Sequence, residues 1–203
     1  MIYRVLDISA FGEEDYLRAY EELPLWRQEK VRRYSRVEDK RRCVFSYALL
    51  ISLIRECTET HGAIDIFPDG KGKLKLRNIP MGISISHSGN FVAACVHSGE
   101  VGIDIETVRD VSMSVINRAL NEEEREYICL SGEGETLSAE SLCAERFFEL
   151  WTAKEAYVKF TGEGLSGLKS AVIDTSGKLS VKNSSCKLLA EKTEEYILSV
   201  VYE

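Results

Sequence analysis

The segment VGIDIE at residues 101–106 limits the possible folds of this chain more than any other part of its sequence. Aliphatic residues alternate there with a glycine and two acids, which is the period-two pattern of a β-strand. Because successive side chains of a strand point to opposite faces, Asp104 and Glu106 share one face. At a separation of about 6.8 Å, two unit charges repel by about 2.4 kcal/mol if the effective dielectric is about 20. A wet surface tolerates such a pair, but a cleft requires a cation beside it.

The type of ligand indicates which cation that would be. Carboxylate oxygens are hard ligands, and Mg²⁺ is commonly held by one or two protein carboxylates together with water and substrate phosphates. The alternative is a strand with a solvated acidic face. A third metal-binding group elsewhere in the chain would favour a magnesium site.

Composition excludes several classes of protein. The 203 residues are 44% hydrophobic and 29% charged, which is typical of one large or two small globular domains. No apolar run approaches the ~20 residues that span a bilayer, and the first residues lack a signal-peptide pattern, so we expect a cytoplasmic protein with no membrane partner. The six cysteines are irregularly spaced, as expected of reduced core residues. The net charge of −7 argues against a nucleic-acid partner.

One segment departs from this acidic composition. Residues 27–42 contain eight Lys or Arg residues against three acids. Pro24 is suited to the first turn of a helix, and in such a helix Arg27 and Lys30 lie along one side. A site for a discrete anion is one explanation of this segment, and a solvated cationic helix face is the other.

The hydrophobic pattern predicts helices and strands along the whole chain. Strands are expected at residues 2–8, 63–67, 73–76, 82–86, 91–97, 101–106, 171–175, 186–191 and 196–202. Helices are expected at residues 13–22, 25–34, 38–60, 115–120 and 139–161, with a polar loop at 131–138. Asn121 caps a further turn, and Glu124 stands three residues on in the capping-box position, which gives that glutamate a structural role.

The order of these elements is similar in residues 1–100 and residues 101–203. Each part begins with a strand that carries an aspartate, and each contains a long helix. We therefore expect an α+β fold of two pseudo-symmetric halves, each a small, mainly antiparallel sheet packed with a long helix. The active site would then lie in the cleft between the two halves.

The long helix at 139–161 and the segment ISHSGN at 85–90 contain further candidate site residues. Trp151, Glu155 and Lys159 are four residues apart and lie on nearly one helix face. The tryptophan suggests burial, and a buried Glu and Lys need partners, which a metal and a phosphate would supply. An exposed ion pair is the alternative. Ser86, His87 and Ser88 precede a glycine turn, where side chains and backbone N–H groups suit phosphate oxygens.

Two separated motifs together resemble one protein family. GIDIE at 102–106 and WTAKEAYVKFTGEGL at 151–165 resemble the paired signature of the 4′-phosphopantetheinyl transferases. ISHSG at 85–89 and the Gly-Lys loop before it match the order of that family, so the resemblance covers most of the chain from residue 23 to residue 165. The likeness is to the Sfp-like group, whose single chains hold two pseudo-symmetric halves.

The resemblance implies an enzyme that moves 4′-phosphopantetheine from coenzyme A to a serine hydroxyl of an apo acyl or peptidyl carrier protein and releases adenosine 3′,5′-bisphosphate. It implies that Asp104, Glu106 and Glu155 hold Mg²⁺ against the pyrophosphate of coenzyme A, and that Lys159 contacts the pyrophosphate. Glu155, Glu124 and a metal-held water are the candidate bases for the serine proton, and the sequence leaves the choice open. A monomer is expected, because one chain would build the whole site.

Coenzyme A itself would be bound by a set of mainly basic residues. Lys73 is preferred to Lys71 in the Gly-Lys loop because of its spacing to His87, and both stay open. The chain has Ser46 and Tyr47 where the family often has a Gly-Asp pair, so this part of the pocket differs. By the resemblance, the residues that bind coenzyme A are Arg27, Lys30, Arg42, Lys71 or Lys73, Ser86, His87 and Lys159.

Two other functions are consistent with the same residues. One is a catalytically silent module that binds coenzyme A or a carrier protein. The other is a Mg²⁺-dependent phosphohydrolase that uses the same carboxylates. The complete set of acids with Lys159 favours the active transferase, since a silent copy has no need of a self-repelling pair.

Overall fold

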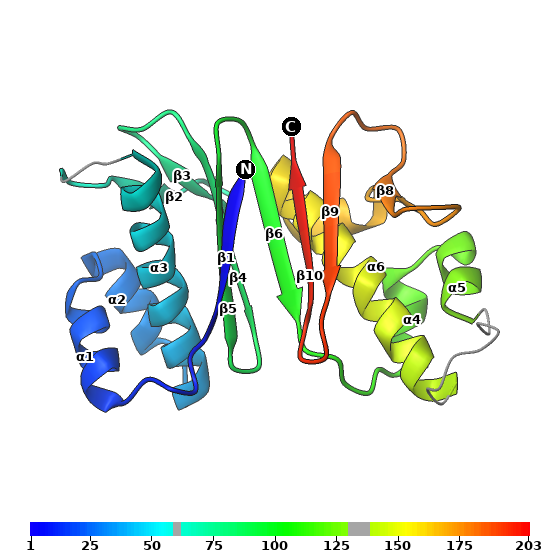
Figure 1. Ribbon diagram of the computed structural model, residues 1–203, viewed down its shortest axis with the longest axis horizontal. Coiled ribbons are helices and arrows are strands. Elements are labelled where there is room, and N and C mark those ends of the chain that lie inside the picture. The colour runs from blue at the N-terminus through cyan, green and yellow to red at the C-terminus, as the bar shows by residue number, and fades with distance from the viewer. Residues whose placement is uncertain (59–61, 130–138) are drawn as a thin grey trace.

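Two separate three-stranded antiparallel sheets form the centre of the structure, as Figure 1 shows for this computed structural model. The structure describes residues 1–58, 62–129 and 139–203. The first sheet has the order β1-β5-β4, with β1 at Ile2–Asp7, β4 at Gly82–Ser88 and β5 at Phe91–His97. The second has the order β6-β10-β9, with β6 at Val101–Glu106, β9 at Lys187–Lys192 and β10 at Ile197–Tyr202. Two short hairpins complete the strands: β2 (Ile66–Pro68) with β3 (Leu74–Leu76), and β7 (Ile173–Asp174) with β8 (Ser180–Val181).

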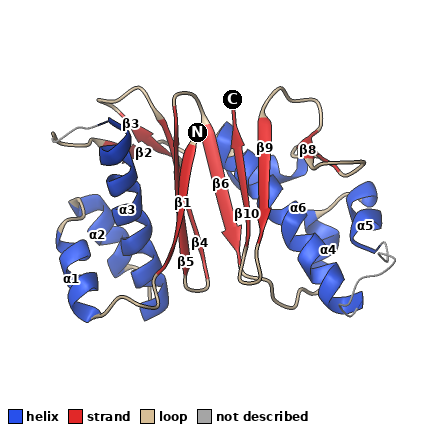
Figure 2. Ribbon diagram, in the orientation of Figure 1, coloured by secondary structure: helices blue, strands red, loops and turns tan. Residues whose placement is uncertain are grey.

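The helices lie on the two outer sides of the sheets, with the strands between them (Figure 2). The first sheet is accompanied by α1 (Glu13–Glu21), α2 (Leu25–Arg32) and α3 (Val37–Thr58). The second is accompanied by α4 (Met113–Ala119), α5 (Glu122–Cys129), α6 (Ala139–Thr161) and the 3₁₀ helix η1 (Gly164–Lys169). None of the helices within the described ranges is long and apolar enough to cross a membrane.

The predicted α+β class with small antiparallel sheets is confirmed. The long helix predicted at 139–161 has the same bounds in the structure, and the predicted strand 101–106 is β6. Helix α3 is described up to Thr58, and its predicted end at residue 60 lies outside the described part of the chain, as do residues 59–61 in general. The polar loop predicted at 131–138 also lies outside it.

Each long helix builds a separate apolar core. Helix α3 packs Leu50, Leu53 and Ile54 against the first sheet at helical spacing. Helix α6 packs Phe147 and Leu150 against α4, α5 and the second sheet. The predicted burial of a tryptophan on α6 is partial, since Trp151 is half-buried and its ring stacks on Phe147 at 5.9 Å.

A third apolar cluster joins the two sheets. Cys95 of β5, Ile103 and Ile105 of β6 and Val200 of β10 belong to it and are fully buried. Strands β5 and β6 are therefore covered on both faces, like central strands, although they belong to different sheets. The division at residues 100 and 101 stays a prediction, because strands from both sides of it share this cluster.

Gly102 in β6 lies directly against the backbone of α6. A Cβ atom at this position would overlap the carbonyl oxygen of Ala156 and the amide nitrogen of Phe160. These are backbone atoms of a helix, which cannot rotate away as a side chain can. The glycine of the GIDIE motif is therefore required by packing.

We expect Gly102→Ala to destabilise the protein by about 3 kcal/mol or more, because the added methyl group pushes β6 off α6. Urea denaturation followed by circular dichroism measures the change in the free energy of unfolding. Gly177→Ala is the matched control, since a Cβ there meets no atom within 4 Å. Equal stability of the two variants would contradict this account of Gly102.

Candidate functional site

A pocket of about 370 Å³ is lined by elements from both parts of the chain. Its walls come from α2, α3, the β2–β3 loop, β4 and the second half of α6. The sequence-predicted residues that line it are Arg27, Lys30, Lys71, Lys73, Ser86, His87, Glu155 and Lys159. Residues far apart in the sequence thus meet at one place, with basic groups in the majority.

Strand β4 is joined to β6 at this site by serine side chains. Ser86 donates a hydrogen bond from Oγ to Asp104 Oδ1 at 2.7 Å, and Ser88 donates to Glu106 Oε2 at 2.6 Å. Because side chains alternate along a strand, the two serines share one face of β4, as the two acids share one face of β6. Ser86 was predicted to hold a phosphate, but its hydroxyl is already used to orient a carboxylate.

Asp104 is paired with a lysine inside the protein. The Nζ of Lys159 lies 2.6 Å from Asp104 Oδ1 and also donates to Ser86 Oγ at 2.9 Å and to the carbonyl of Ile103 at 3.1 Å. Asp104 is 5% exposed, and its Oδ2 is buried without a hydrogen-bond partner among the described residues. Burial raises the pKa of Asp104, although Lys159 and Ser86 act in the opposite direction.

The other two acids of the predicted metal site have separate surroundings. Glu106 Oε2 accepts from Ser88 and, at 2.8 Å, from Arg109 Nη1. Glu155 lines the pocket, and its pKa is raised by burial and by the charges of Asp104 and Glu106, against the effect of Lys159. The three acids are thus close enough to influence one another electrostatically.

The three acids do not form a ready metal site. Within residues 1–58, 62–129 and 139–203, no group of three or more His, Cys, Asp or Glu side chains is arranged to hold a metal ion. The physical reason is that Asp104 is held by Lys159 and Glu106 is held by Arg109. The predicted ligand set of Asp104, Glu106 and Glu155 is therefore not assembled in this structure.

Arg27 is a buried cation at the other end of the pocket. Its side chain is 3% exposed, and one Nη donates to the carbonyl of Cys43 at 3.0 Å and to Ser46 Oγ at 3.4 Å. The guanidinium lies 5.4 Å from the ring of Tyr47 and 5.9 Å from that of Trp26. Its Nε has no partner among the described residues, and burial lowers the pKa of Arg27. A buried cation whose described contacts are neutral is suited to an anionic ligand.

The lysines near Arg27 at this end of the pocket differ in whether their ammonium groups already bind other groups of the protein. The Nζ of Lys73 forms an ion pair with Glu100 and donates to the carbonyl of Phe160 at 2.5 Å. Lys71 is exposed at the pocket, and no ion pair of its ammonium occurs within the described ranges. Burial lowers the pKa of Lys30, and the charge of Arg27 lowers it further. Lys71 is thus less engaged by groups of the protein than Lys73. This geometry favours Lys71 as the contact to coenzyme A, whereas the sequence-based preference was Lys73.

His87 is a neutral side chain in a basic environment. Its pKa is lowered to about 4 by burial and by the charges of Lys159 and Arg42. The imidazole is therefore uncharged at neutral pH and can donate one hydrogen bond and accept another. Arg42 does not line the pocket, because its guanidinium is held by the carbonyl of Gly89 at 2.9 Å and by Asp39 at 2.6 Å.

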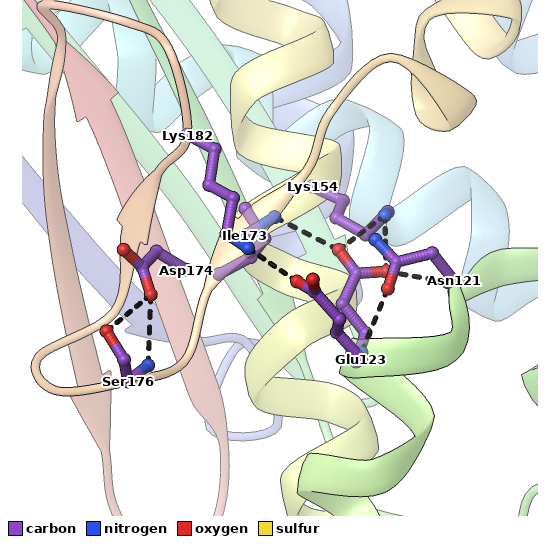
Figure 3. A network of polar contacts seen from close by, with 8 residues as sticks. Asn121, Glu123, Lys154, Ile173, Asp174, Ser176 and Lys182 are labelled. Carbon is purple, nitrogen blue, oxygen red and sulfur yellow. Dashed lines mark hydrogen bonds and ion pairs between the residues drawn. The ribbon is translucent and has the colours of Figure 1, made fainter.

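Glu124 belongs to a buried structural network rather than to the pocket. Figure 3 shows Asn121, Lys154 and Ile173, which are members of this network. Its side chain is fully buried and accepts from Lys154 Nζ at 2.8 and 2.9 Å and from the backbone N–H of Ile173 at 3.0 Å. It also accepts from the N–H of Asn121 at 2.9 Å, and Asn121 Oδ1 caps the Glu124 N–H, which confirms the predicted capping box. Both carboxylate oxygens are occupied and Glu124 does not line the pocket, while its catalytic role stays a prediction.

Sequence reasoning missed Lys154 and Arg109. Lys154 is 2% exposed, and a lysine among the apolar residues of a helix was a signal that an acid partner would be needed. Ser88 was predicted with Ser86 as a phosphate contact, whereas its hydroxyl donates to Glu106 in the structure. The pairing of Arg109 with Glu106 had no sequence signal, because an exposed loop arginine has many possible partners.

Comparison with known proteins agrees with this fold and pocket. Residues 100–201 match the family model described as the 4′-phosphopantetheinyl transferase superfamily. The chain is 35% identical over 135 residues to the 4′-phosphopantetheinyl transferase psf-1 of Bacillus pumilus, an alignment that covers 65% of this chain and 55% of psf-1. It is 27% identical over 167 residues to the 4′-phosphopantetheinyl transferase Sfp of Bacillus subtilis (strain 168), covering 81% and 71% of the two chains.

A third relative is the 4′-phosphopantetheinyl transferase gsp of Aneurinibacillus migulanus, which is 27% identical over 139 residues, or 68% of this chain and 56% of gsp. The aligned part thus spans little more than half the length of psf-1 and of gsp. The chain belongs to the 4′-phosphopantetheinyl transferase superfamily, because the family model matches half of it. Within that superfamily its relatives place it in the Sfp-like group.

Lys154→Met should destabilise the protein by about 3–5 kcal/mol, because it leaves Glu124 as an unpaired buried charge. Lys182→Met is the matched control: its ion pair with Glu123 is largely exposed and should contribute less than about 1 kcal/mol. Urea denaturation of both variants measures the difference. A loss below about 1 kcal/mol for both would show that the buried pair does not stabilise the fold.

His87 should make the stability of the protein depend on pH. Its folded pKa of about 4 lies below the ordinary value of 6.5, so between these two pH values the unfolded chain binds more protons and stability rises with pH. Between pH 7 and pH 4 the free energy of unfolding of the unaltered protein should fall by about 3 kcal/mol more than that of the His87→Gln variant. Urea denaturation across this range measures the two curves. Parallel curves would contradict the lowered pKa.

Proposed function

We propose that this chain transfers the 4′-phosphopantetheine of coenzyme A to a serine hydroxyl of an apo acyl or peptidyl carrier protein and releases adenosine 3′,5′-bisphosphate. The observation that carries the proposal is one pocket in which cations of α2 and the β2–β3 loop face Glu155 and Lys159 of α6. Coenzyme A carries phosphate at two places, and a pocket with cations at two places is suited to such a ligand.

The nucleotide end of coenzyme A would lie against α2 and the β2–β3 loop. Arg27 is buried beside two aromatic rings, and its Nε is unsatisfied within the described structure, so that a phosphate would give it the partner it lacks. Lys30 and Lys71 line the same end and add positive charge. Arg42 would act through its charge rather than by contact, because its guanidinium is already bound to Asp39 and Gly89.

The pyrophosphate would lie near Lys159 and His87. Lys159 is 29% exposed and lines the pocket, so its ammonium is within reach of a ligand. Neutral His87 can donate a hydrogen bond to a phosphate oxygen without adding charge. Hydrogen-bond donors that are already in position would thus stabilise the negative charge on the transferred phosphoryl group. Such stabilisation is the main requirement of phosphoryl transfer.

Mg²⁺ fits the chemistry of the neighbouring acids. Asp104 Oδ2 is a buried carboxylate oxygen without a hydrogen-bond partner among the described residues, and burial together with the negative charges beside it raises the pKa of Glu155. An all-oxygen donor set of this kind suits a hard divalent ion. We propose that Asp104, Glu106 and Glu155 would hold it, and that it would neutralise charge on the pyrophosphate when bound.

Glu155 is the proposed acceptor of the serine proton. In the reaction a bond forms between the serine oxygen and phosphorus, the bond to the leaving phosphate oxygen breaks, and the hydroxyl proton must go to a base. Burial and the neighbouring acids raise the pKa of Glu155, which makes it a better proton acceptor than an ordinary carboxylate. We do not propose Glu124 for this role, because its carboxylate accepts hydrogen bonds within a buried network.

The remaining parts of the proposal concern the whole protein. We propose a cytoplasmic monomer whose residues 1–100 supply the nucleotide end of the site and whose residues 101–203 supply the acids and Lys159. The single pocket with walls from both parts supports this division, because one chain then provides every group named.

The test is incubation of the protein with coenzyme A, Mg²⁺ and apo carrier proteins of fatty-acid, polyketide and peptide synthesis, followed by intact mass spectrometry. We expect the mass of phosphopantetheine on one serine of at least one carrier. Asp104→Asn should lower the rate about 100-fold or more, because it removes a carboxylate that would hold the divalent cation at the pyrophosphate. Asp110→Asn, at an exposed acid outside the pocket, is the matched control and should keep full activity.

Other outcomes of the same experiment identify the alternatives. Coenzyme A that is cleaved when no carrier is present would indicate a phosphohydrolase. Coenzyme A that binds but leaves every carrier unmodified would indicate a silent binding module. No mass shift with any of the three carrier classes would reject the proposed transfer.

A further inference from the structure

Lys159 is fully occupied by groups of the protein although it borders the pocket. Its Nζ has three N–H donors, and three acceptors lie within hydrogen-bond distance: Asp104 Oδ1, Ser86 Oγ and the carbonyl of Ile103. Yet its side chain is 29% exposed, whereas that of Asp104 is 7% exposed. The ammonium therefore lies between the buried carboxylate and the space of the pocket.

The surrounding charge explains why the ammonium stays there. Asp104, Glu106 and Glu155 act on one another through their negative charges, and like charges repel. Lys159 is the cation in contact with Asp104 within the described ranges, and Arg109 is the one in contact with Glu106. Each acid of β6 thus has its own internal counter-cation.

We propose that Lys159 is a competing counter-cation, which holds Asp104 in the ligand-free protein and exchanges this carboxylate for a phosphate of the substrate. The inference rests on the proposed function and deepens it, because binding of a divalent cation at Asp104 then depends on a pyrophosphate-bearing substrate. A divalent cation and an ammonium repel each other at one carboxylate. A substrate phosphate at the pocket gives Lys159 another acceptor and removes this repulsion.

The proposal has a thermodynamic consequence that no structural role of Lys159 would produce. If the substrate strengthens binding of the divalent cation, the cation must strengthen binding of the substrate by the same factor. The coupling also requires the pyrophosphate. Adenosine 3′,5′-bisphosphate fills the nucleotide end but lacks the pyrophosphate, so it should not release Lys159.

The first measurement uses the unaltered protein. Mn²⁺ serves as the probe, and its free concentration is followed by electron paramagnetic resonance at pH 8 and low, constant ionic strength. We expect coenzyme A to tighten Mn²⁺ binding about tenfold or more, and adenosine 3′,5′-bisphosphate to leave it unchanged within about twofold. Equal effects of the two ligands would overturn the proposal without any variant.

The second measurement changes the lysine. Lys159→Gln keeps a hydrogen-bond donor without charge, Lys159→Met keeps neither, and Lys159→Arg keeps both. The two uncharged variants should bind Mn²⁺ alone about tenfold or more tighter than the unaltered protein and should lose the coupling to coenzyme A. Lys159→Arg should resemble the unaltered protein. Thermal melting confirms that each variant is folded.

Lys71→Met is the matched control, because it removes a pocket cation that contacts neither acid of β6. It should weaken coenzyme A binding and leave the affinity for Mn²⁺ alone unchanged. If the uncharged variants of Lys159 bind Mn²⁺ no more tightly than the unaltered protein does, the inference is wrong. The proposed function would still stand if the transfer assay shows carrier modification. If the unaltered protein binds no Mn²⁺ even with coenzyme A, the inference is also overturned.

Discussion

The arrangement of this protein depends on how two carboxylates are accommodated on a strand that is covered on both faces. Strand β6 packs on α6 and on the first sheet, so Asp104 and Glu106 are largely withdrawn from water. Serine hydroxyls of β4 satisfy one oxygen of each acid. These bonds also join the two sheets, which share no backbone ladder. The same hydrogen bonds therefore hold the two sheets together and fix the acids at one end of the pocket.

Helix α6 serves two charge systems because successive helical residues are rotated by about 100°. Lys154 points to the buried carboxylate of Glu124, whereas the next residue, Glu155, lines the pocket. Lys159, one turn beyond Glu155, completes the pocket side. The buried pair fixes the helix against α5 and β7, so the positions of the pocket residues follow from a network they do not touch.

Local patterns in the sequence predicted the elements well, and their partners poorly. The alternation of apolar residues predicted β6. The helical spacing of apolar residues, with two glycines after it, predicted α6. Both signals lie within the element that they predict. The capping box of Asn121 was likewise local. The bonds of Lys73 to Glu100 and to α6 join residues 27 and 87 positions apart, so spacing along the chain could not assign them.

The distribution of charge around the pocket indicates why stability and ligand binding are linked. A buried guanidinium with only neutral described contacts, such as Arg27, opposes folding because its charge is taken out of water. An anion bound to the folded state offsets this penalty, and the same ligand has no site on the unfolded chain. At the other end, internal cations already neutralise the acids of β6. The basic end thus has a buried cation without an anionic partner among the described residues, whereas the acids of β6 are internally compensated.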